Sequence, residues 1–89
     1  MRLVFRPEAQ EELLEAQAWY ESRALGLGYE FARAVDAATS SALRTPLAFP
    51  RIEAQFRHVI LRKFPYSIIY HLAGSDIVVV SCFHHRRRP

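Results

Sequence analysis

Cysteine and glycine are scarce in this 89-residue sequence, and each shortage excludes a class of protein. The single cysteine, Cys82, has no second thiol with which to form an internal disulfide or a zinc site built on paired cysteines. The three glycines, Gly26, Gly28 and Gly74, do not form a glycine-rich phosphate-binding loop. No stretch resembles a signal peptide or a membrane span. We therefore expect a protein of the reducing cytoplasm that uses neither a cofactor nor a membrane.

Hydrophobic residues make up 51% of the sequence and charged residues 24%, which indicates one globular domain over residues 1–89. The charges are segregated along the chain. Residues 1–43 hold four Arg against seven acidic residues, a balance of −3, whereas residues 44–89 hold eight basic residues against two acidic ones, a balance of +6. An Arg-rich half favours contacts with the phosphates or carboxylates of a partner, although a solvated basic edge would give the same composition.

Three runs rich in Val, Ile, Tyr and Phe predict an antiparallel meander over residues 56–64, 66–72 and 76–83. Pro65 separates the first two runs, and a turn at residues 73–75 separates the last two. The last run is apolar on both faces, which predicts a central strand. Strict alternation places one set of its side chains on one face and the other set on the opposite face: Ile77, Val79, Ser81 and Phe83 against Val78, Val80, Cys82 and His84.

Two amphipathic helices are predicted before the meander. Pro7 ends a short alternating strand over residues 2–6 and begins a helix over residues 7–22, and a second helix runs from Gly28 to about Arg44, before Pro46. Residues 47–53 are expected to form a loop. The apolar stripes of the helices are Ala9, Leu13, Ala16 and Tyr20 in the first, and Phe31, Val35, Ala38 and Ala42 in the second. The fold class is therefore α+β, in the order β-α-α-β-β-β, with a helical hairpin packed on a small, mainly antiparallel sheet.

Leu14 and Trp19 lie off the stripe of the first helix. They form either a second contact with the core or an exposed apolar strip for a partner, and the sequence leaves both interpretations open.

Chemical groups gather at the end of the last predicted strand. His84, with Arg57, Arg62 and the run Arg86, Arg87 and Arg88, could support RNA cleavage without a metal, in which His is the general base and Arg stabilises the charge on phosphorus. The same residues could equally form a rim that binds protein or nucleic acid. His84 and His85 point to opposite faces of a continuing strand, so we expect no metal site.

Several short motifs in order resemble the RelE/ParE toxin superfamily of type II toxin–antitoxin modules. They are W-Y-E at residues 19–21, G-L-G-Y-E-F at 26–31, P-x-x-x-P at 46–50, F-P-Y-S-I-I-Y at 64–70 and H-H-R-R-R-P at 84–89. The resemblance implies a small bacterial toxin that inhibits growth and is neutralised by a cognate antitoxin wrapped around it. Under that resemblance, Leu14 and Trp19 become antitoxin contacts.

The resemblance also implies two possible targets. RelE-like toxins cleave messenger RNA on the ribosome with a basic cluster, and Arg57 and Arg87 match that cluster, whereas Val59 and Ser67 stand where it has Lys and Arg. His84 would have to supply another base. ParE-like toxins instead poison DNA gyrase and need no catalytic cluster.

The chain resembles the ParE-like branch more closely. Its expected target-binding residues are Arg62, His85, Arg86 and Arg88, and His84, Arg57 and Arg87 are expected to be catalytic only in a nuclease. An inactive relative that binds only an antitoxin is the third interpretation.

Overall fold

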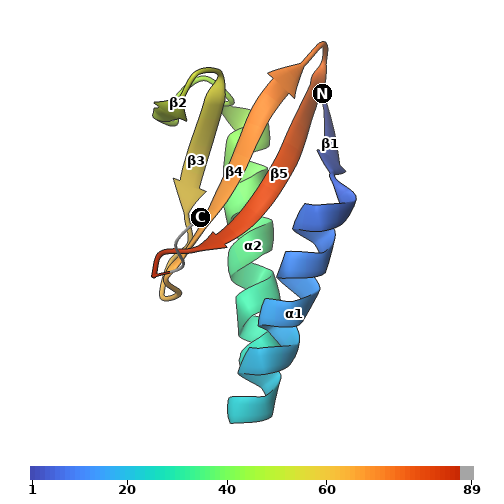
Figure 1. Ribbon diagram of the computed structural model, residues 1–89, viewed down its shortest axis with the longest axis vertical. Helices are drawn as coiled ribbons and strands as arrows, with labels where there is room; N and C mark the ends of the chain where they lie inside the picture. The colour runs from blue at the N-terminus through green and yellow to red at the C-terminus, as the bar shows by residue number, and fades with distance from the viewer. Residues whose placement is uncertain (87–89) are drawn as a thin grey trace.

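The computed structural model describes residues 1–86 of the chain, as one sheet with two helices on one of its faces (Figure 1). The elements follow in the order β1 (Arg2–Phe5), α1 (Pro7–Arg23), α2 (Leu27–Arg44), β2 (Arg51–Glu53), β3 (Phe56–Ile60), β4 (Tyr66–Ala73) and β5 (Asp76–His84). The predicted α+β class and order are confirmed. One strand, β2, was not expected, because residues 51–53 were predicted to be loop.

The sheet has the strand order β1-β5-β4-β3-β2, so the first and last strands of the chain are neighbours. β1 runs parallel to β5, with Leu3 opposite Ile77 and Phe5 opposite Val79. The other strand pairs are antiparallel. The prediction that β5 lies inside the sheet is confirmed, since β1 and β4 flank it.

The helices form an antiparallel hairpin because a short turn joins them. Glu21 fastens this turn, since its two carboxylate oxygens accept hydrogen bonds from the backbone N–H groups of Gly26 and Gly28, each at 2.9 Å. Gly28 brings α2 against α1: a methyl group there would lie 2.8 Å from the carbonyl oxygen of Gln17. No helix in residues 1–86 is both long enough and apolar enough to span a membrane.

The core lies between the helices and the inner face of the sheet. The helical stripes predicted from sequence face it: Ala9, Ala16, Phe31, Val35, Ala38 and Ala42 are buried, and Leu13 and Tyr20 pack against them. An aromatic cluster closes the core at one end. The ring of Tyr20 stacks on Phe31 at 5.3 Å between centroids and meets Phe64 edge-on at 4.9 Å.

A β-bulge in β5 changes which of its side chains face the core. Ser81 pairs with Ile69 and Val79 pairs with Tyr70, so Val80 is the additional residue. The strict alternation predicted from sequence is therefore wrong beyond Val79, because each later side chain moves to the other face. Cys82 is consequently fully buried.

β3 also ends earlier than predicted, at Ile60 instead of residue 64. The backbone turns at Lys63, whose φ of 70° lies in the left-handed region, and the N–H of Leu61 donates to the carbonyl of Tyr66 at 2.9 Å. The β3–β4 connection and the end of β5 thus meet at the same end of the sheet, where the N–H of His85 donates to the carbonyl of Pro65 at 2.8 Å.

Candidate functional site

β5 has an open edge next to α1. β1 ends at Phe5, opposite Val79, and β5 continues to His84 with no strand of residues 1–86 beside it on that side. Glu12 of α1 contacts this edge. Its Oε1 accepts hydrogen bonds from the backbone N–H of Cys82 at 3.0 Å and from the hydroxyl of Ser81 at 3.1 Å. A carboxylate therefore takes the place of a neighbouring strand.

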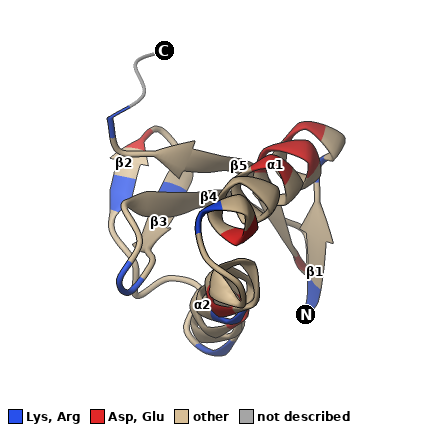
Figure 2. Ribbon diagram, turned by 90° about the horizontal axis from the view of Figure 1, so that it is seen from below, with Lys and Arg blue, Asp and Glu red and all other residues tan. Residues whose placement is uncertain are grey.

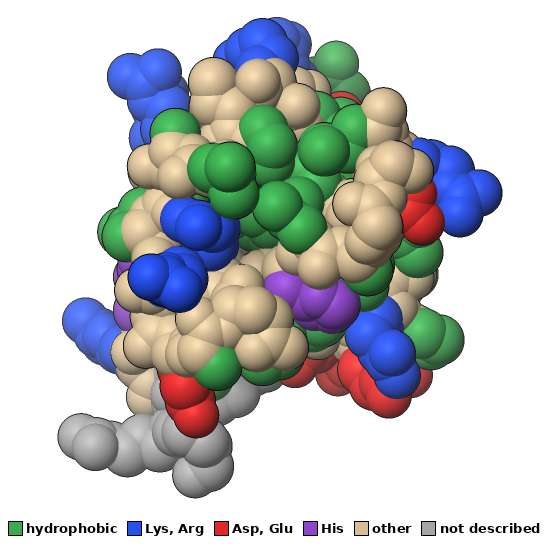
Figure 3. Space-filling view, turned by 90° about the horizontal axis from the view of Figure 1, so that it is seen from above, with side chains coloured by type: hydrophobic (Ala, Val, Ile, Leu, Met, Phe, Trp, Pro, Cys, Tyr) green, Lys and Arg blue, Asp and Glu red, His purple; other side chains and the backbone are tan. Residues whose placement is uncertain are grey.

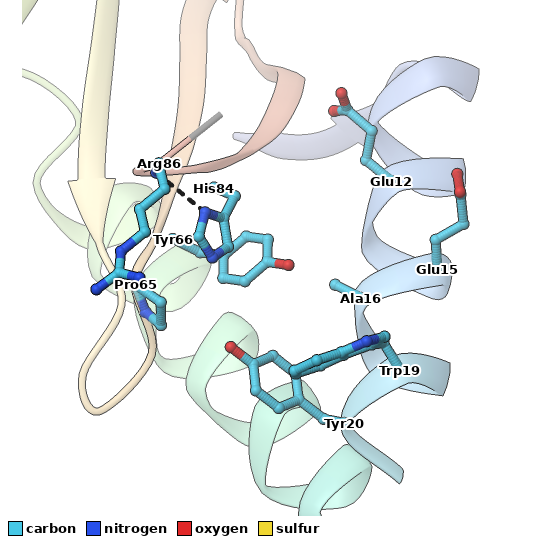
Figure 4. Close-up of a pocket in the computed structure, with 9 residues that line it drawn as sticks. All are labelled: Glu12, Glu15, Ala16, Trp19, Tyr20, Pro65, Tyr66, His84 and Arg86. Atoms are coloured by element: carbon cyan, nitrogen blue, oxygen red, sulfur yellow. Dashed lines mark hydrogen bonds between the residues drawn. The ribbon is translucent and has the colours of Figure 1, made fainter. Parts of the chain in front are cut away.

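A cleft of about 580 Å³ lies between α1 and the ends of β4 and β5 (Figure 4). We call it the helix–edge cleft. Its lining residues are Glu12, Glu15, Ala16, Trp19 and Tyr20 from α1, and Pro65, Tyr66, His84 and Arg86 from the sheet side. Four aromatic or imidazole rings and two carboxylates thus surround one space.

The rings of the cleft are held by specific contacts. The imidazole of His84 packs edge-on against Tyr66 at 4.9 Å between centroids, and its Nδ1 accepts the backbone N–H of Arg86 at 3.0 Å. A neutral ring that accepts at Nδ1 carries its proton on Nε2. Burial raises the pKa of Tyr20 above its ordinary value of 10.0, and Cys82 acts in the same direction. Tyr20 therefore stays protonated at neutral pH.

The sheet face away from the helices is a second candidate surface, which we call the outer face. Its hollow, of about 520 Å³, is lined by Ile52, His58, Ile60, Ser67, Ile69, Phe83 and His85. Ile52 and Ile60 are 48% and 59% exposed. A hydrogen bond of 2.8 Å joins Ser67 Oγ to His85 Nε2, and Ser67 itself is buried. The outer face is therefore mainly apolar, and two of its polar groups, the Ser67 hydroxyl and the His85 imidazole, are paired with each other.

The structure does not bring together the residues proposed for a nuclease. Arg57 lies opposite Tyr70 and His84 lies opposite Tyr66, four residues away on β4. The two are therefore offset by about 13 Å along the strand direction, and β4 lies between their strands. The Nη1 of Arg57 donates to the carbonyls of Leu47 at 3.2 Å and Phe49 at 2.6 Å, so its guanidinium holds the loop after α2. Arg87, the third member, lies outside the described residues.

The residues expected to bind the target lie around the lower end of the sheet. Arg62 follows β3 and lines a hollow with Tyr29 and Arg33 of α2. His85 is on the outer face, and Arg86 lines the helix–edge cleft. Arg88 lies outside the described residues. Seen from this end, Asp and Glu are concentrated on α1, whereas Lys and Arg lie around the sheet and on α2 (Figure 2).

The opposite end of the molecule has a different surface. Figure 3 shows hydrophobic side chains gathered there at the centre, with Lys and Arg around them. Arg62, His85 and Arg86 do not belong to this end, because the β3–β4 connection and the end of β5 meet at the other one.

The two expected antitoxin contacts, Leu14 and Trp19, are 52% and 53% exposed. The interpretation that they form a second contact with the core is therefore wrong, because both side chains are exposed. Trp19 also lines the helix–edge cleft and has the guanidinium of Arg23 over its ring at 4.9 Å. Sequence reasoning missed Glu12 and the apolar outer face, because the first depends on the bulge and the second on the unexpected strand β2.

The chain is similar to known proteins in its fold and in its sequence. The fold is similar to that of a chromosomal ParDE system from P. aeruginosa, with a TM-score of 0.67 and 17% identity over 94% of this chain and 95% of that one. It is similar to a YoeB/ParE toxin from Agrobacterium tumefaciens, with a TM-score of 0.71 and 17% identity over 96% of this chain and 99% of that one. It is also similar to the E. coli RelBE toxin–antitoxin complex, with a TM-score of 0.67 and 19% identity over 97% of this chain and 98% of that one. No curated protein gives a significant sequence match. Residues 3–89 match the model of the ParE toxin of the type II toxin–antitoxin system parDE. The chain therefore belongs to the ParE toxin family.

Proposed function

We propose that this toxin binds and inhibits DNA gyrase without catalysing a reaction, and that a cognate antitoxin neutralises it. The observation that carries the proposal is that two positions where a RelE-like nuclease would have basic side chains are uncharged and buried here, beside an apolar outer face. At Ser67, where a RelE-like nuclease would have an Arg, the chain has a buried hydroxyl bonded to His85. At Val59, where such a nuclease would have a Lys, the side chain is only 7% exposed and belongs to the core. An apolar surface favours binding a protein over stabilising charge on a phosphate.

The outer face with its basic surroundings is the proposed gyrase contact. Ile52 and Ile60 supply exposed apolar area. Arg51, Arg62 and Arg86 are exposed and lie within two residues in sequence of Ile52, Ile60 and His85, which line the outer face. An apolar centre with a cationic rim suits an acidic protein surface, because the centre is desolvated on binding while the rim charges steer the approach.

The antitoxin contact is proposed on the helical hairpin. Leu14 and Trp19 of α1, together with Leu25 and Tyr29 near the helix turn, are large hydrophobic side chains that are more than half exposed. A partner helix or extended segment that covered them would remove this apolar area from water. The ParDE and RelBE structures, to which this fold is similar, are toxin–antitoxin systems by name.

One observation favours the second candidate, a ribosome-dependent endoribonuclease. His84 lies in the helix–edge cleft beside Tyr66, with Arg86 in the same lining, so an imidazole, a neighbouring phenol and a cation line the same space. These groups would suit general acid–base chemistry on RNA.

The first test is pulse-labelling of DNA and protein synthesis in bacteria during the minutes after induction of the chain without its antitoxin. Early loss of thymidine incorporation is expected, and the purified chain should inhibit supercoiling by gyrase. Ile60→Asp should weaken this inhibition at least about tenfold, because it places a charge in a desolvated contact. Leu25→Asp, at a side chain that is 97% exposed on the helix turn, is the matched control.

Two results would contradict the proposal. Early loss of methionine incorporation, with ribosome-dependent messenger cleavage that His84→Ala abolishes, would establish the nuclease. No effect of the folded chain on either synthesis would mean an inactive antitoxin-binding relative.

A further inference from the structure

A hollow between the start of α2 and the β3–β4 connection gathers cationic side chains. Its volume is about 550 Å³, and we call it the basic hollow. Its polar and aromatic lining comes from Tyr29, Glu30 and Arg33 of α2 and from Arg62 and Lys63 of the connection. Three cations stand here against one carboxylate, a balance of +2. Lys and Arg mark both α2 and the β3–β4 connection at this end of the molecule (Figure 2).

The three cations of the basic hollow are not neutralised by the protein. Within residues 1–86 none of them forms an ion pair. The guanidinium of Arg33 lies over the ring of Tyr29, 5.9 Å from its centroid, and the side chains of Arg62 and Lys63 are exposed. Like charges that line one space repel one another, and a bound anion turns this repulsion into attraction. The hollow therefore favours an anionic ligand.

The backbone at Lys63 gives a second, independent indication of a ligand. Lys63 has a φ of 70°, in the left-handed region, where glycine is unstrained and a residue with a side chain is not. It is also the only lysine in the sequence. Strained backbone of this kind is often found at sites that hold a ligand. The chain thus has an ammonium group at the basic hollow in a position where the backbone favours glycine.

We propose that the basic hollow binds a nucleoside di- or triphosphate. The phosphates lie among Arg33, Arg62 and Lys63, which donate charge-assisted hydrogen bonds to them. The base packs on the ring of Tyr29, which is 65% exposed, and the carboxylate of Glu30 accepts a hydrogen bond from a ribose hydroxyl.

The size of the basic hollow suits one nucleotide, because its volume lies within the range of small-molecule sites. This inference goes beyond the gyrase contact proposed above, with which the basic hollow shares only Arg62. It is therefore independent of whether gyrase or the ribosome is the target.

The test uses ATP as the probe and Lys63 as the reporter. Because the sequence has a single lysine, reductive methylation with ¹³C-formaldehyde labels one side-chain amine and the terminal α-amino group. ATP, titrated without divalent cations, should shift the Lys63 methyl signal in the NMR spectrum until it saturates. The α-amino signal is the internal control and should not move, since the N-terminus lies at the opposite end of the molecule (Figure 1). Adenosine and inorganic phosphate should each bind at least about tenfold more weakly than ATP, because each contains only part of the ligand.

A matched pair of variants locates the phosphates. Arg33→Gln should raise the Kd of ATP, measured by isothermal titration calorimetry, at least about fivefold, since it removes one charge-assisted contact. Arg44→Gln is the control, because Arg44 is an exposed arginine of the same helix that does not line the basic hollow. It should leave the Kd unchanged.

Two further variants separate binding from stability and the base from the phosphates. Lys63→Gly should weaken ATP binding without lowering the urea midpoint, because relief of strain offsets the greater freedom of glycine in the unfolded chain. Tyr29→Leu should weaken the binding of ATP but not that of inorganic triphosphate, which has no base.

The proposal is wrong if the Lys63 signal does not saturate with ATP, or if Arg33→Gln and Arg44→Gln have equal effects. It is also wrong if Lys63→Gly binds ATP as the wild type does. Tight binding of a single-stranded oligonucleotide that depends on Arg33 and Lys63, with no binding of ATP, would contradict it too. That result would make the basic hollow a contact for a nucleic-acid backbone.

Discussion

The contact between Glu12 and the open edge of β5 gives a quantitative prediction for stability. Glu12→Ala removes two hydrogen bonds to a charged acceptor, from the N–H of Cys82 and the hydroxyl of Ser81. Hydrogen bonds of this kind contribute about 1.5–3 kcal/mol each, and the lower figure suits a partly buried site where water reaches the freed donors. Alanine regains a few tenths of a kcal/mol in helix propensity. We expect a net loss of about 2.5 kcal/mol in the free energy of unfolding.

Urea denaturation followed by circular dichroism would measure this loss, with an unchanged m-value showing that the unfolded state is the same. In a thermal scan the same loss corresponds to a Tm lower by about 10–20 °C for a domain of this size. Ser81→Ala should cost about 1 kcal/mol, because the bond from Cys82 remains. Glu11→Ala, on the exposed face of the same helix, is the control and should stay within about 0.5 kcal/mol of the wild type. If Glu12→Ala were no more destabilising than this control, the carboxylate would not be holding α1 to β5.

Three further perturbations test other contacts. Gly28→Ala should destabilise the fold by about 1–3 kcal/mol although Ala favours helices, because its methyl would lie 2.8 Å from the carbonyl of Gln17; a gain in urea midpoint would contradict this close approach. Arg57→Ala should lower the free energy of unfolding by about 2 kcal/mol, because two loop carbonyls lose their hydrogen-bond donor. Toxicity in cells should fall only in proportion to the folded fraction. A folded variant without toxicity would instead place Arg57 in the target site. Burial raises the pKa of Tyr20 and of Tyr70 above 10.0, so the unfolded chain loses these phenol protons at a lower pH than the folded chain does. The free energy of unfolding should therefore fall as the pH rises through 10.0, which urea denaturation at several alkaline pH values would measure. A free energy of unfolding that did not change with pH there would argue against burial of these hydroxyls.

The two helices and the three-stranded meander can be predicted from the sequence alone. Pro7 at the start of α1 and small or apolar residues at helical spacing mark the two helices, since a stripe of this kind has only one way to be buried. The three long strands follow from their β-branched and aromatic runs, separated at Pro65 and Gly74. The turn at Gly74 fits its φ of 60°.

The parts that escaped prediction depend on contacts between distant residues. Val78, Val79 and Val80 are all apolar, so alternation carries no information about register there, and the bulge at Val80 is set by pairing with β4. β2 has three residues, all exposed, which is too short to show a period. From the sequence, Glu12 is predicted to be one more solvent-facing acid of α1, because the residue whose N–H donates to its carboxylate, Cys82, lies 70 positions away.

The position of β5 between β1 and β4 also has a consequence for how the protein is made. The ribosome synthesises β5 after every other described element, yet without it β1 has no neighbouring strand and is cut off from β4. Both candidate surfaces use β5 as well, the helix–edge cleft through His84 and the outer face through Phe83 and His85, which directly follows the strand. An incomplete nascent chain therefore holds the helical hairpin and part of the sheet but neither surface, because pairing of residues so distant in sequence forms late. The protein therefore acquires both surfaces together, once β5 has been synthesised and has joined the sheet.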